Sequence, residues 1–405
     1  MGARNDEVES LLFKVAFVIY VMSVFFNALH KSAFSFLPMN MIINVMRITA
    51  ALIAYFIYFR KCSISLKFFV AIIFMVALPL IFRSLYSSAI FVVWGLVLAA
   101  KDRKLDEWVD MCIVYLIIAL SVAFLFSSLG IIPNDVKLRT VPFFGTWRSY
   151  YWGFHYYSTP AYYGMSLGIL ILYKNRDRCS YALLLKLLGL AAFVFVMTFT
   201  RLQFIVNCLV LFLYLVVYKL KILTLEGKIW KYYSIVAYPL MTLIVVGYSF
   251  VAIFMMTDNF EELNEMSGSR MAMNVQAFMN YDLNMWGNQI EIKTRDMGKD
   301  ESYFYIDSGY VSAILTYGLV FYSFLMCCYG ILMYRAWKLK CKFVYIVFLV
   351  FSVANLMNNF LMNLVTFPFL LLLTCDFEAI APKREILKMK LLELIKGNRY
   401  RLIKS

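Results

Sequence analysis

The sequence has few charged residues for its length. Only 16% of its 405 residues are Asp, Glu, Lys or Arg, and 63% are hydrophobic, whereas soluble domains usually carry about 25% charged residues. The apolar residues fall into blocks of roughly 16 to 24, long enough to cross a hydrocarbon core about 30 Å thick. This composition excludes a soluble globular protein and indicates a polytopic membrane protein.

Motifs that carry familiar chemistry are also scarce. The chain has two histidines and no HExxH, CxxC, P-loop or GxGxxG pattern, so we expect no metal site and no cofactor. The eight cysteines fall in predicted spans or at predicted cytoplasmic connections, and extracytoplasmic disulfides are not expected. The first apolar block lacks a small-residue cleavage site and is predicted to remain as a span.

The apolar blocks predict an all-α membrane fold with about twelve transmembrane helices. They lie at 11–29, 41–59, 66–82, 85–100, 109–129, 156–173, 181–198, 202–218, 233–256, 307–334 and 343–374. As one helix, the last block would be about 48 Å long, too long for one ordinary crossing. The polar turn Asn358-Asn359 could split it into two short spans, whereas a single kinked helix would put the C-terminal tail on the opposite side. The basic tail after Pro382 favours the split, with both termini cytoplasmic.

The basic residues predict the orientation, because lysine and arginine concentrate in cytoplasmic connections. With both termini cytoplasmic, the inner connections and tails hold 28 of the 39 basic residues, including the basic tail 376–405. The net charge of +15 is then a signal of topology and of contact with anionic lipid, and it does not call for nucleic acid. The chain, 1–405, is predicted to be one polytopic domain in a membrane.

Two extracytoplasmic loops are longer than connections require. The first covers 130–155 and is rich in aromatic and basic residues, and the second covers 257–306 and is acidic. Loops of this length are usually functional or disordered. Within the second loop we predict a helix over 266–281, with Ser267 or Ser269 as its N-cap.

Arginines on the predicted outer side oppose the orientation rule, so each needs a reason. They are Arg47, Arg83, Arg148, Arg201 and Arg270. Each could be a solvated or snorkelling side chain at the lipid headgroups. Five at one predicted depth favour an anionic ligand instead, and the guanidinium fork suits phosphate oxygens.

The stretch TWRSYYWGFHYYSTPAYYG, residues 146–164, holds nine aromatic residues, among them Trp147, Trp152 and Tyr156. An interfacial belt of Trp and Tyr is one explanation. The density, with Arg148 and His155 interleaved, favours a platform on which sugar rings stack. Within spans, Gln203 and Asn207 share a helix face, as Asn355, Asn359 and Asn363 would if their region were helical. Such groups should face the bundle interior, where they either hold the helices together or line a wet cavity.

Four blocks now carry a family resemblance. They are Arg148 with GFHYYSTPA (153–161), TFTRLQF (198–204), GSRMAMNVQAFMNYDLNMWGNQI (268–290) and IDSGYVSAILTYGLV (306–320). Their order, spacing and placement resemble bacterial O-antigen and capsular polysaccharide polymerases of the Wzy type, within the polymerase and ligase superfamily. The match includes Asp307, Tyr310 and Gly318 in the fourth block. It departs from the family at Tyr157-Ser158, where a Pro-Asn pair would be expected, so no role is carried over there.

The resemblance implies an enzyme in the bacterial cytoplasmic membrane that joins oligosaccharide repeat units carried on undecaprenyl pyrophosphate. Arg148, Arg201 and Arg270 would stabilise the pyrophosphate leaving group, with Arg47 and Arg83 as weaker members. No cofactor is then required. A flippase and a chain-length regulator are the protein partners that the resemblance suggests.

The acceptor hydroxyl needs a general base in such a reaction. His155 suits the role by its intrinsic pKa, and Asp307 and Glu291 are carboxylate alternatives. His155 could instead make a structural hydrogen bond, and Asp307 could be an N-cap. A ligase of the same superfamily, which transfers finished glycan, and a lipid-linked oligosaccharide flippase or transporter are the alternative functions.

Overall fold

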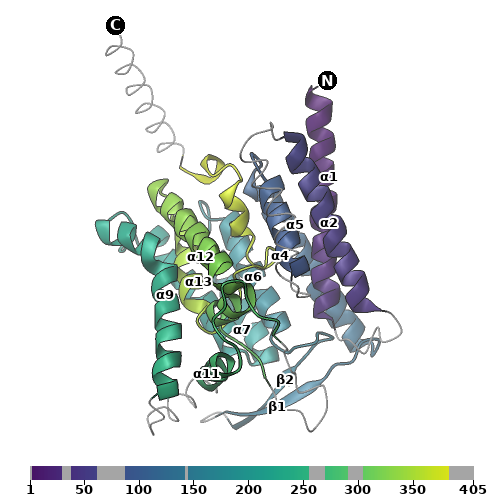
Figure 1. Cartoon of the computed structure of the whole chain (residues 1–405), viewed down its shortest axis with the longest axis vertical. Helices are drawn as coiled ribbons and strands as arrows, with labels where there is room; N and C mark the ends of the chain where they lie inside the picture. Colours follow the sequence, from purple (N-terminus) through teal and green to yellow (C-terminus); the bar gives the residue numbers. More distant parts are fainter. Residues whose placement is uncertain are drawn as a thin grey trace.

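The apolar blocks form a bundle of helices, shown in Figure 1. The computed structural model describes residues 2–29, 38–61, 87–141, 145–254, 270–290 and 304–382. Its α-helices are α1 (Gly2–Ala28), α2 (Met39–Lys61), α4 (Ser87–Ala99), α5 (Leu105–Ser128), α6 (Thr159–Lys174), α7 (Tyr181–Thr198), α8 (Arg201–Tyr214), α9 (Lys228–Phe254), α11 (Arg270–Asn280), α12 (Gly309–Lys338) and α13 (Lys342–Ala354). A π-helical turn, η2 (Leu215–Lys219), extends α8, and η4 (Pro368–Leu373) and η5 (Glu378–Ile380) are 3-10 helices.

Seven of the described helices are long and apolar enough to cross a membrane. They are α1, α2, α5, α7, α8 with η2, α9 and α12, while α4 and α13 are shorter apolar helices. The chain is therefore a multi-pass membrane protein. The predicted span at 66–82 lies outside the described residues, and the total of twelve spans stays a prediction.

The two ends of the bundle differ in their charges. In Figure 1, α1 begins at one end, here called the basic end, and the two strands and α11 lie at the other, here called the hairpin end. Ion pairs at the basic end join Arg60 to Glu9, Lys174 to Asp110, Arg176 to Asp106, and Lys340 and Lys342 to Glu226. The predicted inner connections thus share one end of the bundle. That this end is cytoplasmic stays a prediction.

The predicted loop 130–155 contains a β-hairpin, a two-stranded sheet in a structure whose other described elements are helices. Strand β1 (Val136–Val141) pairs antiparallel with β2 (Gly145–Tyr150), and Leu138 lies opposite Arg148. The segments are rich in Val, Leu, Thr, Trp and Tyr, most of which favour strands. In the second loop, the helix predicted over 266–281 is present as the shorter α11.

The block 343–374 turns back where predicted, but its second half is not an α-helix. Helix α13 ends at Ala354, so Asn355, Asn359 and Asn363 do not form the helical stripe that continued helix would give. The chain then returns to the basic end, where the backbone N–H of Asp102 donates to the Thr374 carbonyl at 3.2 Å. The Asn363 side chain accepts from two backbone N–H groups in this irregular leg, an Asx turn that competes with helix. Most of its side chains are buried, and irregular backbone at membrane depth is tolerated only when protein covers it.

Candidate functional site

The segment between β2 and α6 brings the opening aromatic stretch into the bundle. Trp152 stacks on Phe124 of α5 with ring centroids 4.5 Å apart, and its backbone N–H donates to the Asn134 side chain at 2.9 Å. The backbone N–H of His155 donates to the carbonyl of Ala28, at the end of α1, at 2.9 Å. These bonds hold the aromatic segment between α1 and α5.

The hairpin packs against the end of α7 through one tryptophan. Trp147 Nε1 donates to the Val196 carbonyl at 3.3 Å, and its ring lies 4.9 Å from that of Phe199. Because side chains alternate along a strand, Arg148 lies on the opposite face of β2, and it is exposed. Arg201, the first residue of α8, is also exposed.

No direct contact joins Arg148 and Arg201 in the described part of the chain, and neither guanidinium has an ion pair or hydrogen bond there. Arg270 begins α11, but its side chain is outside what the structure describes. The clamp of three arginines thus stays a prediction. The structure places two of its members unpaired at one end of the bundle.

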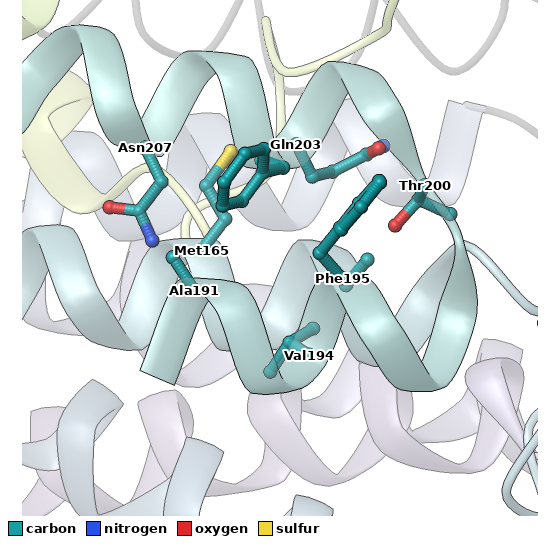
Figure 2. Close-up of a pocket in the computed structure, with 9 residues that line it drawn as sticks. Met165, Ala191, Val194, Phe195, Thr200, Gln203 and Asn207 are labelled. Carbon is teal, nitrogen blue, oxygen red and sulfur yellow. The ribbon is translucent and has the colours of Figure 1, made fainter. Parts of the chain in front are cut away.

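Helices α6, α7 and α8 meet in a small cavity, shown in Figure 2, which Thr200 at the N-cap of α8 helps to line. Gln203 and Asn207 line it, as do Met165 of α6 and Phe195 of α7. Both amides are buried, so these polar groups face the bundle interior as predicted. The cavity measures about 10 Å³, close to the smallest volume that holds one water. It is a packing feature and is too small for a sugar.

A polar cluster lies deeper, where α6, α12 and α13 meet. The Tyr162 hydroxyl donates to Asn358 Oδ1, and the backbone N–H of Gly309 donates to the carbonyls of Asn355 and Asn358 at 2.9 and 3.0 Å. Asn359 Nδ2 donates to the Ser312 hydroxyl at 3.3 Å. We call these groups, Tyr162, Gly309, Ser312, Asn355, Asn358 and Asn359, the asparagine cluster.

The asparagine cluster lies within the thickness of the bundle. Helix α13 has 13 residues and so rises about 20 Å from the basic end, less than the about 30 Å of a hydrocarbon core. The ring of Tyr163 lies 6.1 Å from that of Tyr115, near the middle of α5. Asn358 is buried and Asn359 is exposed, so the cluster reaches from the packed interior to an accessible surface.

Two of the predicted bases lie on neighbouring segments. The ring of His155 is 4.3 Å from that of Tyr156, which in turn lies 6.5 Å from Tyr305, two residues before Asp307. Both His155 and Asp307 are half-buried. The N-cap of α12 is Ser308, whose hydroxyl accepts from the Val311 N–H at 3.4 Å. This corrects the alternative that Asp307 is the N-cap of the helix.

The third and fourth sequence blocks interlock at two glycines. Helix α12 breaks at Gly318, with φ 77° and ψ 167°, and the loop after α11 supplies hydrogen-bond partners to backbone groups on both sides of the break. The N–H of Leu319 donates to the Asn284 carbonyl at 3.0 Å, and the N–H of Asn288 donates to the Leu315 carbonyl at 2.8 Å. A Cβ on Gly318 would collide with Gly287, and one on Gly287 would collide with the Thr316 carbonyl. Both positions therefore require glycine.

The remaining predicted site residues are Tyr310, Arg47, Arg83 and Glu291. Tyr310 is fully buried and its hydroxyl donates to the Ser352 carbonyl at 2.6 Å, which gives it a packing role between α12 and α13. Arg47 lies inside the bundle on α2. Arg83 and Glu291 lie outside the described residues.

The sequence patterns missed several residues that the structure brings to this region. Tyr162 and Asn358 were not proposed as a pair, because 195 intervening residues hide their contact. Lys137, whose Nζ lies 5.4 Å from the Tyr157 ring centroid, was hidden by the unrecognised hairpin. The repeated asparagines at 355–363 were the available signal for the cluster.

Fold and site together define a multi-pass helical membrane protein with an aromatic and cationic site at one end of its bundle. No protein-family model, curated protein or solved structure matches the chain.

Proposed function

We propose that this protein is a polysaccharide polymerase that joins oligosaccharide repeat units carried on a polyprenyl pyrophosphate. In the reaction, the bond between the anomeric carbon of the growing chain and the pyrophosphate oxygen breaks. A hydroxyl oxygen of the next repeat unit bonds to that carbon, and its proton passes to a base. The pyrophosphate departs with the electron pair of the broken bond.

One observation carries the proposal: the four sequence blocks, distant along the chain, meet at the hairpin end. Tyr156 of the first block lies beside Tyr305, next to the fourth block. Ala161 of the first block lines a cavity with Thr200 and Gln203 of the second. The third block is bonded to the fourth at Gly318. Aromatic faces, two candidate bases, and Arg148 and Arg201, which have no ion pair among the described residues, therefore lie at one end of the bundle.

This arrangement suits the chemistry. Pyrophosphate is already a good leaving group, so the enzyme mainly stabilises the charge that develops on it, and fixed cations do this well. Aromatic side chains such as Trp152 and Tyr156 offer faces for sugar rings. His155 carries an imidazole, the side chain that most often acts as a general base, and could take the proton of the acceptor hydroxyl.

The direct test is the size distribution of lipid-linked and surface glycan in cells with and without the protein. Loss of the long ladder, with single repeat units left on the carrier, supports the polymerase. Long chains that stay on the lipid and never reach their final acceptor indicate the ligase. Repeat units that remain on the cytoplasmic leaflet indicate the flippase, and either of these two results contradicts the proposal.

A further inference from the structure

Arg47 lies on the face of α2 that is buried in the bundle. Ile43, four residues before it, and Ala50, three residues after it, are 5% and 0% exposed, and residues at these spacings share one helix face. The lipid side of α2 carries other residues, including Met41 and Val45, which are 67% and 53% exposed. The guanidinium thus points toward the other helices of the bundle.

The neighbours of Arg47 do not neutralise it. Its Nε is buried with no hydrogen-bond partner among the described residues, and Tyr20 on α1 and Tyr317 on α12 are the ionisable residues that influence it electrostatically. Among the described residues no carboxylate pairs with it. Arg47 is half-buried as a whole, so part of the side chain is still accessible.

Its depth separates Arg47 from the two surface arginines. It lies eight positions into α2, about 12 Å from the beginning of the helix at the hairpin end. Arg148 and Arg201 are exposed, on the hairpin and at the first turn of α8. A charged side chain at this depth is costly and usually marks a ligand or a conduction path.

We propose that Arg47 binds a phosphate-bearing group inside the bundle. The ligand supplies the negative charge that the described neighbours of Arg47 do not. A guanidinium can hold two phosphate oxygens at once. This inference rests on the proposed function where it assigns the phosphate to the isoprenoid diphosphate of the carrier lipid. An ordinary phospholipid headgroup has the same chemistry.

The test uses the full-length protein in detergent and farnesyl diphosphate as the probe. Binding is measured from the rise in melting temperature with ligand concentration, for wild type, Arg47→Met and Arg60→Met. Arg60 is a matched control on the same helix, exposed and 4.0 Å from Glu9 at the basic end. Wild type and Arg60→Met should bind alike, and Arg47→Met should bind at least about tenfold more weakly, a loss of about 1.4 kcal/mol.

Stability without ligand separates binding from folding. Because methionine removes an uncompensated charge and keeps much of the volume, Arg47→Met should melt at or above the wild-type temperature. If it fails to fold, Arg47→Lys replaces it. Lysine keeps the charge but loses the fork, so weaker binding is again expected. Wild-type affinity in the variant that folds would overturn the inference.

A second arm identifies the source of the phosphate. Phosphatidylglycerol in mixed micelles should stabilise wild type less than farnesyl diphosphate does. Equal stabilisation that depends on Arg47 would overturn the carrier assignment and leave a phospholipid site. The binding measurement needs no glycan, so the inference about Arg47 and the polymerase proposal can be rejected independently of each other. A ladder that depends on the protein, with normal binding by Arg47→Met, rejects only this inference, whereas Arg47-dependent binding without any effect on the ladder rejects only the polymerase.

Discussion

The two ends of the bundle carry arginine and lysine in different environments. At the basic end, Lys340 and Lys342 share Glu226, and Lys174 lies 2.9 Å from Asp110. At the hairpin end, Arg148 and Arg201 have no ion-pair partner among the described residues. Paired charges satisfy one another and tie connections together, whereas unpaired ones remain available to a ligand. In our proposal, the basic end sets the topology and the hairpin end binds the ligand.

The thiols of Cys341 and Cys375, at the basic end, are also unreactive. Burial raises the pKa of Cys341 and of Cys375 to about 12, so both stay protonated at neutral pH. A protonated thiol is a poor nucleophile.

The largest effect on polymer formation should come from replacing an exposed arginine at the hairpin end. Arg201→Ala should lower the rate of polymer formation by about 100-fold, the usual cost of removing a group that stabilises developing charge. Arg201→Lys should rescue poorly because it loses the bidentate geometry. Glycan length on gels and membrane levels of the protein are the measurements.

Arg178→Ala is the matched control, since Arg178 is an exposed arginine at the basic end. Its polymer should match wild type. A full ladder from Arg201→Ala, or an equal loss from Arg178→Ala, would remove the functional difference between the two ends.

The next largest effect, a loss of stability, should come from disturbing the contact between Gly318 of α12 and Gly287 in the loop after α11. Gly318→Ala places a Cβ against Gly287 at a positive φ, which should lower stability by about 2 kcal/mol or more. Gly247→Ala in α9 is the control, because nothing lies within 4 Å of its added Cβ. Thermal unfolding of the purified proteins measures both, and equal melting temperatures would show that the loop does not depend on this contact.

The asparagine cluster should contribute less to the stability of the protein. Asn358→Ala removes the acceptor of the Tyr162 hydroxyl and should cost about 1 to 2 kcal/mol. Tyr162→Phe removes the other partner, so the double variant should be less destabilised than the sum of the single ones. Additive losses would mean that the two groups do not interact.

The ion pairs of the basic end should contribute least to the stability of the protein. Glu226 is about half exposed, and Glu226→Gln should change stability by no more than about 1 kcal/mol. Polymer length should not change. A severe loss of polymer from this variant would contradict the division of roles between the ends.

Local sequence signals predicted the helices well. The apolar runs gave α5 and α12 nearly in full, and a polar pair gave the turn at Asn358-Asn359. The features that the sequence did not predict depend on contacts between residues distant in the sequence. The hairpin, the irregular return leg and the meeting of Gly287 with Gly318 are set by packing that a linear pattern does not contain.

The functional site stays a prediction, and the structure adds the geometry of its residues. Arginines, aromatic residues and His155 do lie at one end, but Arg148 faces away from Trp147 and makes no contact with Arg201. A strand places neighbouring side chains on opposite faces, and the strand itself was not predicted. Ser308 in place of Asp307 as the N-cap is a difference of one residue, within the usual uncertainty of helix ends.

The most direct measurement is polymer formation by the purified protein in liposomes that contain a lipid-linked repeat unit and no other enzyme. The account predicts a ladder of products that lengthens with time, is lost with Arg201→Ala and is retained with Arg178→Ala. If the wild-type protein, folded and inserted, leaves only single repeat units, the central claim that this chain is a polymerase is contradicted.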